Sequence, residues 1–104
     1  MIKILVVHPD KEPYIAEIEP NEEGISRFVH GEIVPIQLDS VSVLLSSNED
    51  KFLKPNRFLR IPRKNNSSVL LYGTFIITGL TADGNIKSLP TDKMEIYKKS
   101  FACE

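Results

Sequence analysis

An almost unbroken apolar and β-branched run at residues 69–80, Val-Leu-Leu-Tyr-Gly-Thr-Phe-Ile-Ile-Thr-Gly-Leu, constrains the fold more than any other part of the chain. A run of this composition is typical of a strand that is covered on both faces. Gly73 interrupts it, and a glycine inside a strand usually marks a bulge or the close approach of another backbone. We therefore predict one central strand over residues 69–80, with a local irregularity at Gly73.

Four shorter segments also carry strand signals. The apolar segment at the N-terminus stops at Pro9-Asp10, and an alternating segment follows within hairpin distance, so the two are expected to pair antiparallel. In a second such pair, Pro35 argues for an edge position, since proline cannot donate to a hydrogen-bond ladder. The four predicted strands cover residues 2–8, 14–19, 32–38 and 41–46.

Two segments have the spacing of amphipathic helices. In residues 21–31, Asn21 is a suitable N-cap and Gly31 a suitable end, and apolar residues at i, i+3 and i+4 predict about two to three turns. In residues 92–101, Thr91 is the expected N-cap and apolar residues recur at i, i+3 and i+7. The apolar stripes consist of Ile25, Phe28 and Val29 in the first helix and of Met94, Tyr97 and Phe101 in the second.

In chain order, these elements predict an α+β fold: two strands, a helix, two strands, a loop, a strand and a helix (ββαββ-loop-βα). The sheet is expected to be mostly antiparallel, with about five strands. The length of 104 residues suits a single domain over residues 1–104. With 41% hydrophobic and 26% charged residues, the chain falls among folded globular proteins rather than disordered ones.

Simple features predict the compartment. Cys103 is the single cysteine, so no internal disulfide can form, and a reducing cytoplasm is the expected location. The N-terminal apolar stretch is shorter than the roughly 7–15 residues of a secretion signal, and no stretch approaches the ~20 apolar residues of a membrane helix. We therefore expect neither a signal peptide nor a membrane partner.

Few residues suggest catalysis or metal binding. His8 and His30 are the only histidines and show no metal-binding spacing, so surface and helix-capping roles are expected. The chain has no phosphate-binding glycine loop and no nucleophile elbow. Its acidic residues at 17–23 are expected to form a solvated face, with a small metal-dependent hydrolase as the less favoured alternative. The prediction is a non-enzymatic protein without a cofactor.

The basic segment at residues 51–64 is the most informative feature for function. It holds six cations and no anion, whereas residues 1–50 hold three basic and ten acidic residues, a net charge of −7. Arginine binds phosphate oxygens in a bidentate manner, and an adjacent aromatic ring can stack on a base. We predict a site for an anionic partner, in which Asn56 supports Arg57 and Gly73 lets a neighbouring backbone approach. The predicted ligand-binding residues are Lys54, Asn56, Arg57, Arg60, Arg63, Lys64 and Gly73.

Other interpretations of these features stay open at this point. The basic segment can be a solvated loop, or its arginines can bind the acidic half of the same protein. A protein–protein inhibitor that acts through apolar edges is another alternative, with Ile36, Leu38 or the stripe of Tyr97 and Phe101 as its contacts. General nucleic-acid binding is less favoured, because the whole-chain pI is about 6.1.

The chain resembles, over nearly its whole length, a family of small bacterial and phage proteins, domain of unknown function 3846. The family often has more acidic residues where this chain has residues 58–64. The matching pieces are residues 2–7 with Pro9 and the Lys11-Glu12-Pro13 turn, the Pro55-Asn56-Arg57 tripeptide, the Gly-Thr-Phe-Ile-Ile-Thr-Gly run at residues 73–79, and Leu89-Pro90-Thr91 with the helix that follows.

The resemblance implies an accessory gene of phages and mobile elements rather than a function in central metabolism. Small proteins in that setting often blunt host defence, either by sequestering a nucleotide signal or by occupying a defence protein. Together with the basic segment, the resemblance leads us to expect a counter-defence binding module that forms a homo-oligomer. Its expected partner is an anionic small molecule or an acidic protein surface. For a phage-encoded protein, the expected location is the host cytoplasm.

Overall fold

β1 (Ile2–Val7) lies in the interior of the main sheet, as its apolar sequence predicts. It pairs antiparallel with β2 (Tyr14–Ile18) along one side and with β7 (Phe75–Leu80) along the other. The last four residues of β1 are fully buried, because both faces of the strand are covered. The computed structural model describes residues 1–47, 55–61 and 67–102.

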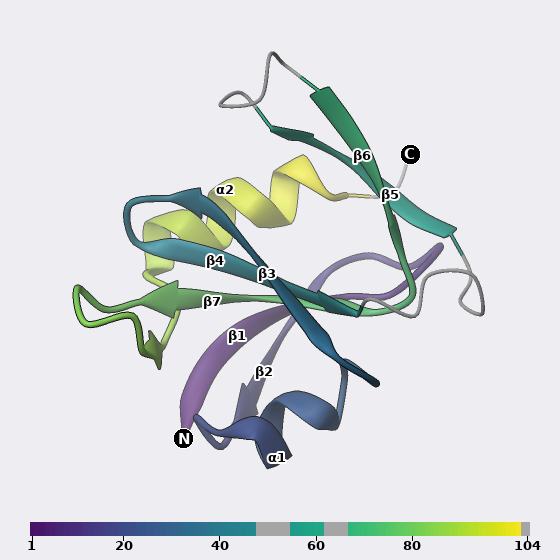
Figure 1. Cartoon of the computed structure of the whole chain (residues 1–104). Helices are drawn as coiled ribbons and strands as arrows, with labels where there is room; N and C mark the ends of the chain where they lie inside the picture. The colour runs from purple at the N-terminus through teal and green to yellow at the C-terminus, as the bar shows by residue number, and fades with distance from the viewer. Residues whose placement is uncertain (48–54, 62–66, 103–104) are drawn as a thin grey trace.

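The main sheet continues from β7 through β4 (Ser42–Ser47) to β3 (Ile33–Asp39), in the order β2-β1-β7-β4-β3 (Figure 1). A two-residue strand, β8 (Ile86–Lys87), pairs with β7 beside this path. The described pairings are all antiparallel, which confirms the predicted α+β class. The sheet has six strands instead of about five, since β8 is too short to leave a pattern in the sequence.

The apolar run at residues 69–80 is divided between two sheets, so the prediction of a single central strand is wrong. β6 (Ser67–Tyr72) ends before Gly73, and β7 follows it. Gly73 is buried and has a φ of 68°, a left-handed conformation that glycine adopts at little cost, and here the chain turns from one sheet into the other. The two halves look alike in sequence because both bury apolar residues, such as Leu71 and Ile76.

β5 (Pro55–Ile61) pairs with β6 in a separate two-stranded sheet. The loop predicted between residues 46 and 69 is therefore wrong for residues 55–61, which form a strand. Strand β6, which holds β5 in an extended conformation, comes later in the chain, with Phe58 opposite Leu70. Local sequence could not reveal this pairing, because two prolines lie near the segment and it has no clean period.

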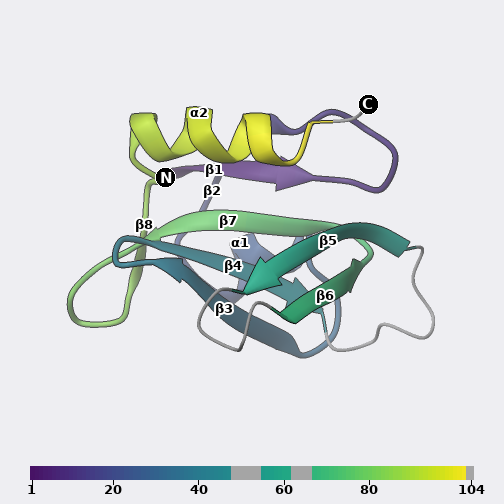
Figure 2. The ribbon, with the colours of Figure 1, turned by 90° about the horizontal axis from the view of Figure 1, so that it is seen from above.

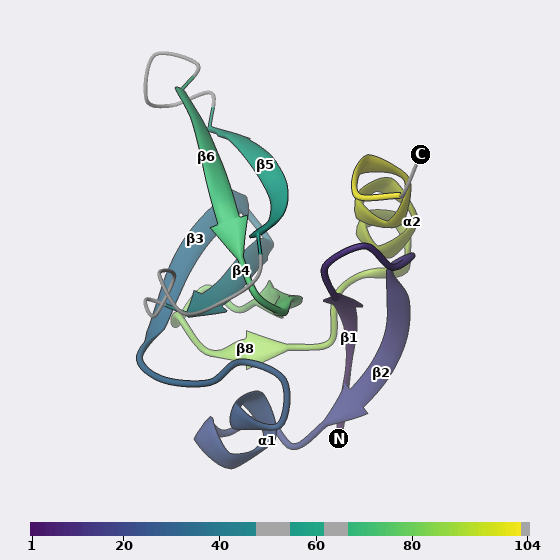
Figure 3. The same ribbon diagram turned by 90° about the vertical axis from the view of Figure 1, so that its right-hand side faces the viewer.

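Different elements cover the two faces of the main sheet (Figures 2 and 3). α2 (Thr91–Ser100) and the β5–β6 pair lie on one face, and α1 (Glu22–Ser26) lies on the other. Successive residues of β1 point to opposite faces, so Leu5 packs in the cluster on the α2 side and Ile4 in the cluster on the α1 side. Two groups of buried residues are thus held together by the strands of one sheet.

Both helices form where predicted, but their ends differ from the prediction. Asn21 caps α1 by accepting a hydrogen bond from the Gly24 N–H at 2.9 Å, as expected. The α-helix stops at Ser26, because the next two N–H groups bond to carbonyls three residues back. At α2, Pro90 takes the N-cap position predicted for Thr91 and makes no side-chain cap bond. Within the described residues, neither helix has the length and apolar character needed to cross a bilayer.

β3 is an edge strand, as Pro35 predicts, because within the described chain it pairs only with β4. The apolar side chains considered for the inhibitor alternative are packed on the core or buried in it. Ile36, Leu38 and Tyr97 pack against the core, and Phe101 is buried in it. Large apolar side chains exposed elsewhere in the described chain are Met1, Tyr14, Ile15, Val34 and Ile96.

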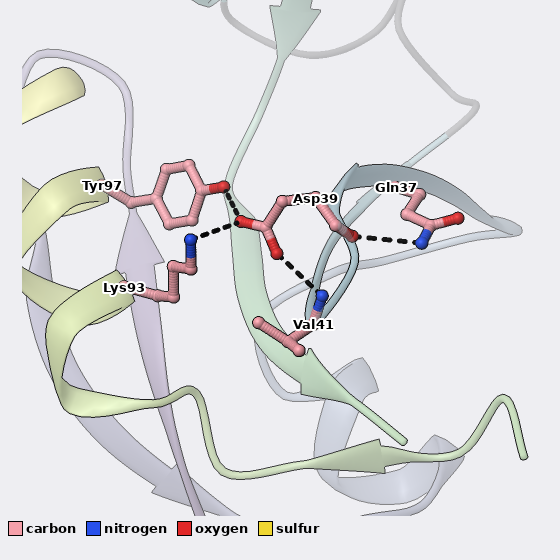
Figure 4. Close-up of polar contacts among 5 residues, drawn as sticks. All are labelled: Gln37, Asp39, Val41, Lys93 and Tyr97. Carbon is pink, nitrogen blue, oxygen red and sulfur yellow. Dashed lines mark hydrogen bonds and ion pairs between the residues drawn. The ribbon is translucent and has the colours of Figure 1, made fainter. Parts of the chain in front are cut away.

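Asp39, at the end of β3, joins α2 to this edge of the sheet (Figure 4). The Tyr97 hydroxyl donates to Asp39 Oδ2, Lys93 Nζ lies 3.7 Å from that oxygen, and the Val41 N–H donates to Oδ1 at 2.8 Å. Burial by itself would raise the pKa of Asp39. The hydrogen bonds and the charge of Lys93 outweigh this effect of burial, so the pKa of Asp39 lies below its ordinary value. Burial and the Asp39 carboxylate raise the pKa of Tyr97. The phenol therefore donates to an ionised carboxylate.

We expect Tyr97→Phe to destabilise the protein by about 1 kcal/mol at pH 7, less than is usual for a bond to a charged group, because Asp39 keeps contact with solvent. Since the folded-state pKa of Asp39 lies below its ordinary value of 3.8, this stabilisation is present above that pH and is lost as the pH falls through the folded-state pKa. Urea unfolding between pH 2 and 7 measures both effects. Tyr72→Phe is the matched control, and an equal loss at pH 2 and pH 7 would contradict the prediction.

Candidate functional site

The structure describes four of the seven predicted ligand-binding residues. Asn56, Arg57 and Arg60 belong to β5, and Gly73 lies between β6 and β7. Asn56 is described with its side chain, whereas Arg57 and Arg60 are placed through their backbone. The predicted residues Lys54, Arg63 and Lys64 lie outside the described residues.

The side chain of Asn56 brings two parts of the predicted site together. Its amide nitrogen donates to the Gly73 carbonyl oxygen at 2.7 Å and to the Val7 carbonyl oxygen at 3.0 Å. One half-buried amide thus ties the start of β5 to the end of β1 and to the turn between the sheets. The contact between Asn56 and Gly73 is thus a side-chain bond to the Gly73 carbonyl, while the predicted ligand-binding role of the two residues stays a prediction.

β5 is irregular at this contact. Pro55 pairs with Tyr72 and Phe58 with Leu70, so two residues, Asn56 and Arg57, stand opposite one residue of β6. This arrangement is a β-bulge, a feature that re-aims side chains and occurs often beside active sites. The Asn56 bonds hold the bulge in place, and with it the backbone of Arg57. Proline at the start of β5 fits this edge position, since it donates no hydrogen bond.

His8 lies beside the same turn and forms contacts that the sequence did not suggest. Its Nδ1 is 2.7 Å from Thr74 Oγ1, and its Nε2 is 2.8 Å from the Tyr14 hydroxyl. The ring also lies 6.5 Å from that of Phe28, between centroids. We call Val7, His8, Tyr14, Asn56, Gly73 and Thr74 the Asn56 junction.

The electrostatics of the Asn56 junction favour a neutral imidazole. Partial burial lowers the pKa of His8 below its ordinary value of 6.5, and the positive charge of Lys11 lowers it further. A neutral imidazole donates through one ring nitrogen and accepts through the other. Whichever tautomer forms, one hydroxyl, of Thr74 or of Tyr14, accepts from the ring and keeps its own hydrogen for another acceptor.

Sequence reasoning placed His8 at a strand end with a surface role, and it passed over Thr74 and Tyr14. The available signal was that His8 directly follows the apolar run of residues 4–7, where a polar side chain that becomes buried must find partners. Those partners come from positions 6 and 66 residues away, which no local pattern relates. His30, expected at a helix end, is exposed and lies beyond the last residue of α1.

A metal site is an alternative use of histidine and carboxylate side chains. Among residues 1–47, 55–61 and 67–102, no group of three or more His, Cys, Asp or Glu side chains is arranged to hold a metal ion. The acidic residues at 17–23 lie at the end of β2 and at the start of α1. The chemistry that the Asn56 junction supports is hydrogen bonding by an imidazole, two hydroxyls and an amide, beside the backbone of an arginine.

Asn56→Ala should destabilise the protein by about 1–3 kcal/mol, because two carbonyl oxygens lose their side-chain donor. Asn56→Asp should lower the stability further at pH 7, since a carboxylate would face two carbonyl oxygens. That additional loss should shrink as acid protonates the carboxyl group. Urea unfolding at pH 4 and pH 7 compares both with Asn85→Asp, a matched change at an exposed turn residue. Wild-type stability of Asn56→Asp at pH 7 would contradict the assignment.

The stability of the protein should also depend on His8. Its folded-state pKa is lowered, so below pH 6.5 the unfolded chain binds the proton more readily than the folded one, and stability falls from pH 6.5 down to the folded-state pKa. Melting temperatures measured in steps from pH 8 to pH 5 should show this decline. We expect His8→Gln to flatten it and His30→Gln to leave it unchanged. A decline of equal size in His8→Gln would assign it to another group.

The comparisons with known proteins place this arrangement in a family. A family model described as Domain of unknown function (DUF3846) matches residues 2–102. No curated protein and no solved structure matches the chain at a significant level. The matched residues run from β1 to the end of α2 and include the whole Asn56 junction. Because the match covers nearly all of its length, the chain belongs to the family of the domain of unknown function DUF3846.

Proposed function

We propose that this protein is a binding module for an anionic partner and that Asn56-Arg57 of β5 is its contact segment. The single observation that carries the proposal is the pair of bonds from the Asn56 amide to the carbonyls of Val7 and Gly73. They hold a β-bulge at one place relative to the main sheet. An arginine on a fixed backbone loses less conformational freedom on binding than one on a loose loop, so it binds an anion more strongly.

The charges around the Asn56 junction support an anionic ligand. Residues 51–64 carry six cations and no anion. Lys11 is near enough to His8 to lower its pKa, so a positive potential reaches the junction from the β1–β2 connection as well. A guanidinium at position 57 would supply paired donors to phosphate oxygens, the geometry that arginine offers and lysine does not.

Neutral donors at the junction favour a small phosphate-bearing molecule. In either tautomer of His8, the Thr74 or the Tyr14 hydroxyl retains a hydrogen to donate. Exposed Tyr14 also presents a ring on which a base can stack. We therefore propose a nucleotide-type ligand, and an acidic protein surface becomes an outcome of the test. The counter-defence role and the oligomeric state implied above remain predictions.

The experiment titrates the protein with inorganic phosphate and with adenosine 3′,5′-cyclic monophosphate, following backbone amide signals by NMR. We expect wild-type shifts centred on residues 56–57 and 73–74. Arg57→Ala should weaken binding at least about tenfold, and Arg57→Lys should weaken it less, since lysine keeps the charge but not the bidentate geometry. The melting temperature of Arg57→Ala should stay within a few degrees of the wild-type value.

Arg27→Ala, at the exposed end of α1, is the matched control and should bind like the wild type. Raising the salt concentration from about 50 to about 200 mM should weaken a contact led by charge. Binding that ignores salt would favour an apolar contact instead. If Arg57→Ala unfolds, Arg57→Lys still decides whether Arg57 binds the ligand or only supports the fold. A folded Arg57→Lys variant with unchanged affinity would make Arg57 structural.

A further inference from the structure

The two edges of the main sheet differ in how they are protected from other chains. An edge strand presents unpaired N–H and C=O groups, and proteins commonly block it with proline, a bulge or a charge. β3 has both Pro35 and a bulge between Gln37 and Asp39. β2 has no proline within it, pairs with β1 in an unbroken register, and pairs with no other strand in the described chain. The β2 edge is therefore the open one.

The β2 edge also exposes a large apolar side chain, that of Ile15, which is 51% exposed. Ile15 stands opposite Leu5, whose side chain packs on the α2 side, so Ile15 belongs to the same face of the sheet. α2 packs over β1, and Ile15 on the next strand keeps half of its surface in contact with solvent.

A cavity of about 430 Å³ adjoins Ile15 on this face. Its apolar lining comes from Ile15, Leu89, Pro90 and Met94, between β2 and the start of α2. The wall opposite β2 is held to β1, because the Leu89 N–H donates to the Lys3 carbonyl at 2.9 Å. The Lys3 N–H in turn donates to Ser88 Oγ at 2.9 Å. A cavity that is already formed beside an open edge is the arrangement in which an added strand inserts a side chain.

The charge near this edge is negative. Residues 12–26 contain five glutamates and no lysine or arginine. Glu17 is exposed and lies two positions from Ile15, on the same face of β2. Lys3 stands opposite Glu17 on β1 and lines the cavity, but one lysine does not offset the glutamates of β2 and its flanks. A second copy would bring the same negative edge against this one, so charge favours a basic segment as the occupant.

We propose that the β2 edge binds an extended, basic segment of a partner protein, which adds as a further strand of the sheet. One apolar side chain of that segment enters the cavity beside Ile15. A basic side chain two positions away lies against Glu17, because alternate residues of a strand share a face. This surface is separate from the Asn56 junction: the cavity lies near the start of β1, and the junction lies at its end.

The probe is a fluorescein-labelled peptide, Thr-Arg-Thr-Leu-Thr-Arg-Thr, which places leucine and both arginines on one face in either strand direction. Fluorescence anisotropy with the full-length protein should show saturable binding. Ile15→Lys should weaken it at least about tenfold, because a lysine at the edge repels the basic strand and blocks the cavity. The matched control is Val34→Lys on the β3 edge, where a 40% exposed residue receives the same charge, and its affinity should change less than about twofold.

Two further peptides separate strand addition from attraction by charge alone. Glutamates in place of the arginines should weaken binding at least about tenfold. N-methylation of leucine and of the threonine after it should do the same, because it removes one N–H from each edge of the strand and keeps every side chain. Equal affinity for the N-methylated peptide would overturn strand addition, and equal affinity for the glutamate peptide would overturn the basic partner.

The proposed site would be overturned if the wild type did not bind the first peptide. It would also be overturned if Val34→Lys lost as much peptide affinity as Ile15→Lys. Sedimentation of the wild type and of Ile15→Lys tests pairing with a second copy. A dimer of the wild type that is absent in Ile15→Lys would assign the β2 edge to a second copy and overturn the proposal. If Ile15→Lys melts well below the wild type, Ile15→Thr, a smaller β-branched change, replaces it and should still weaken peptide binding.

Discussion

The left-handed turn at buried Gly73 is the constraint on which the rest of the structure depends. It separates β6 from β7 and lets one apolar run serve two sheets. Any other residue would have to hold a side chain at a positive φ inside the protein, which is strained. Because the chain turns here, the β5–β6 pair leaves the plane of the main sheet and covers part of the face that α2 leaves open.

That turn also creates the Asn56 junction. With the Gly73 carbonyl oxygen directed to β5, one amide group can bond to the turn and to β1 at once, and it does so at 2.7 and 3.0 Å. Thr74, the next residue, contacts His8, so the end of β1 is bound on both sides. The proposed contact segment thus stands on backbone geometry that belongs to the core. A site supported in this way keeps its shape before a ligand arrives, which reduces the cost of binding.

The proposed surfaces differ in chemistry and in position. The Asn56 junction combines an imidazole and two hydroxyls with a basic segment, whereas the β2 edge combines exposed apolar groups with glutamates. The charge along the chain is uneven, with a net charge of −7 over residues 1–50 from three basic and ten acidic residues and with six cations and no anion over residues 51–64. This separation of charge in the sequence suits a protein with partners of opposite sign.

The sequence by itself determined the α+β class, the pairing of β1 with β2, the edge position of Pro35 and the cap at Asn21. Each of these rests on residues close together in the chain, where period, proline and capping chemistry act locally. Only the tertiary structure decided that residues 69–80 form two strands, that β5 is extended and that Thr74 and Tyr14 hold His8. The physical reason is that these features depend on partners up to 66 residues apart, and the energy of a pairing or a hydrogen bond belongs to both partners together.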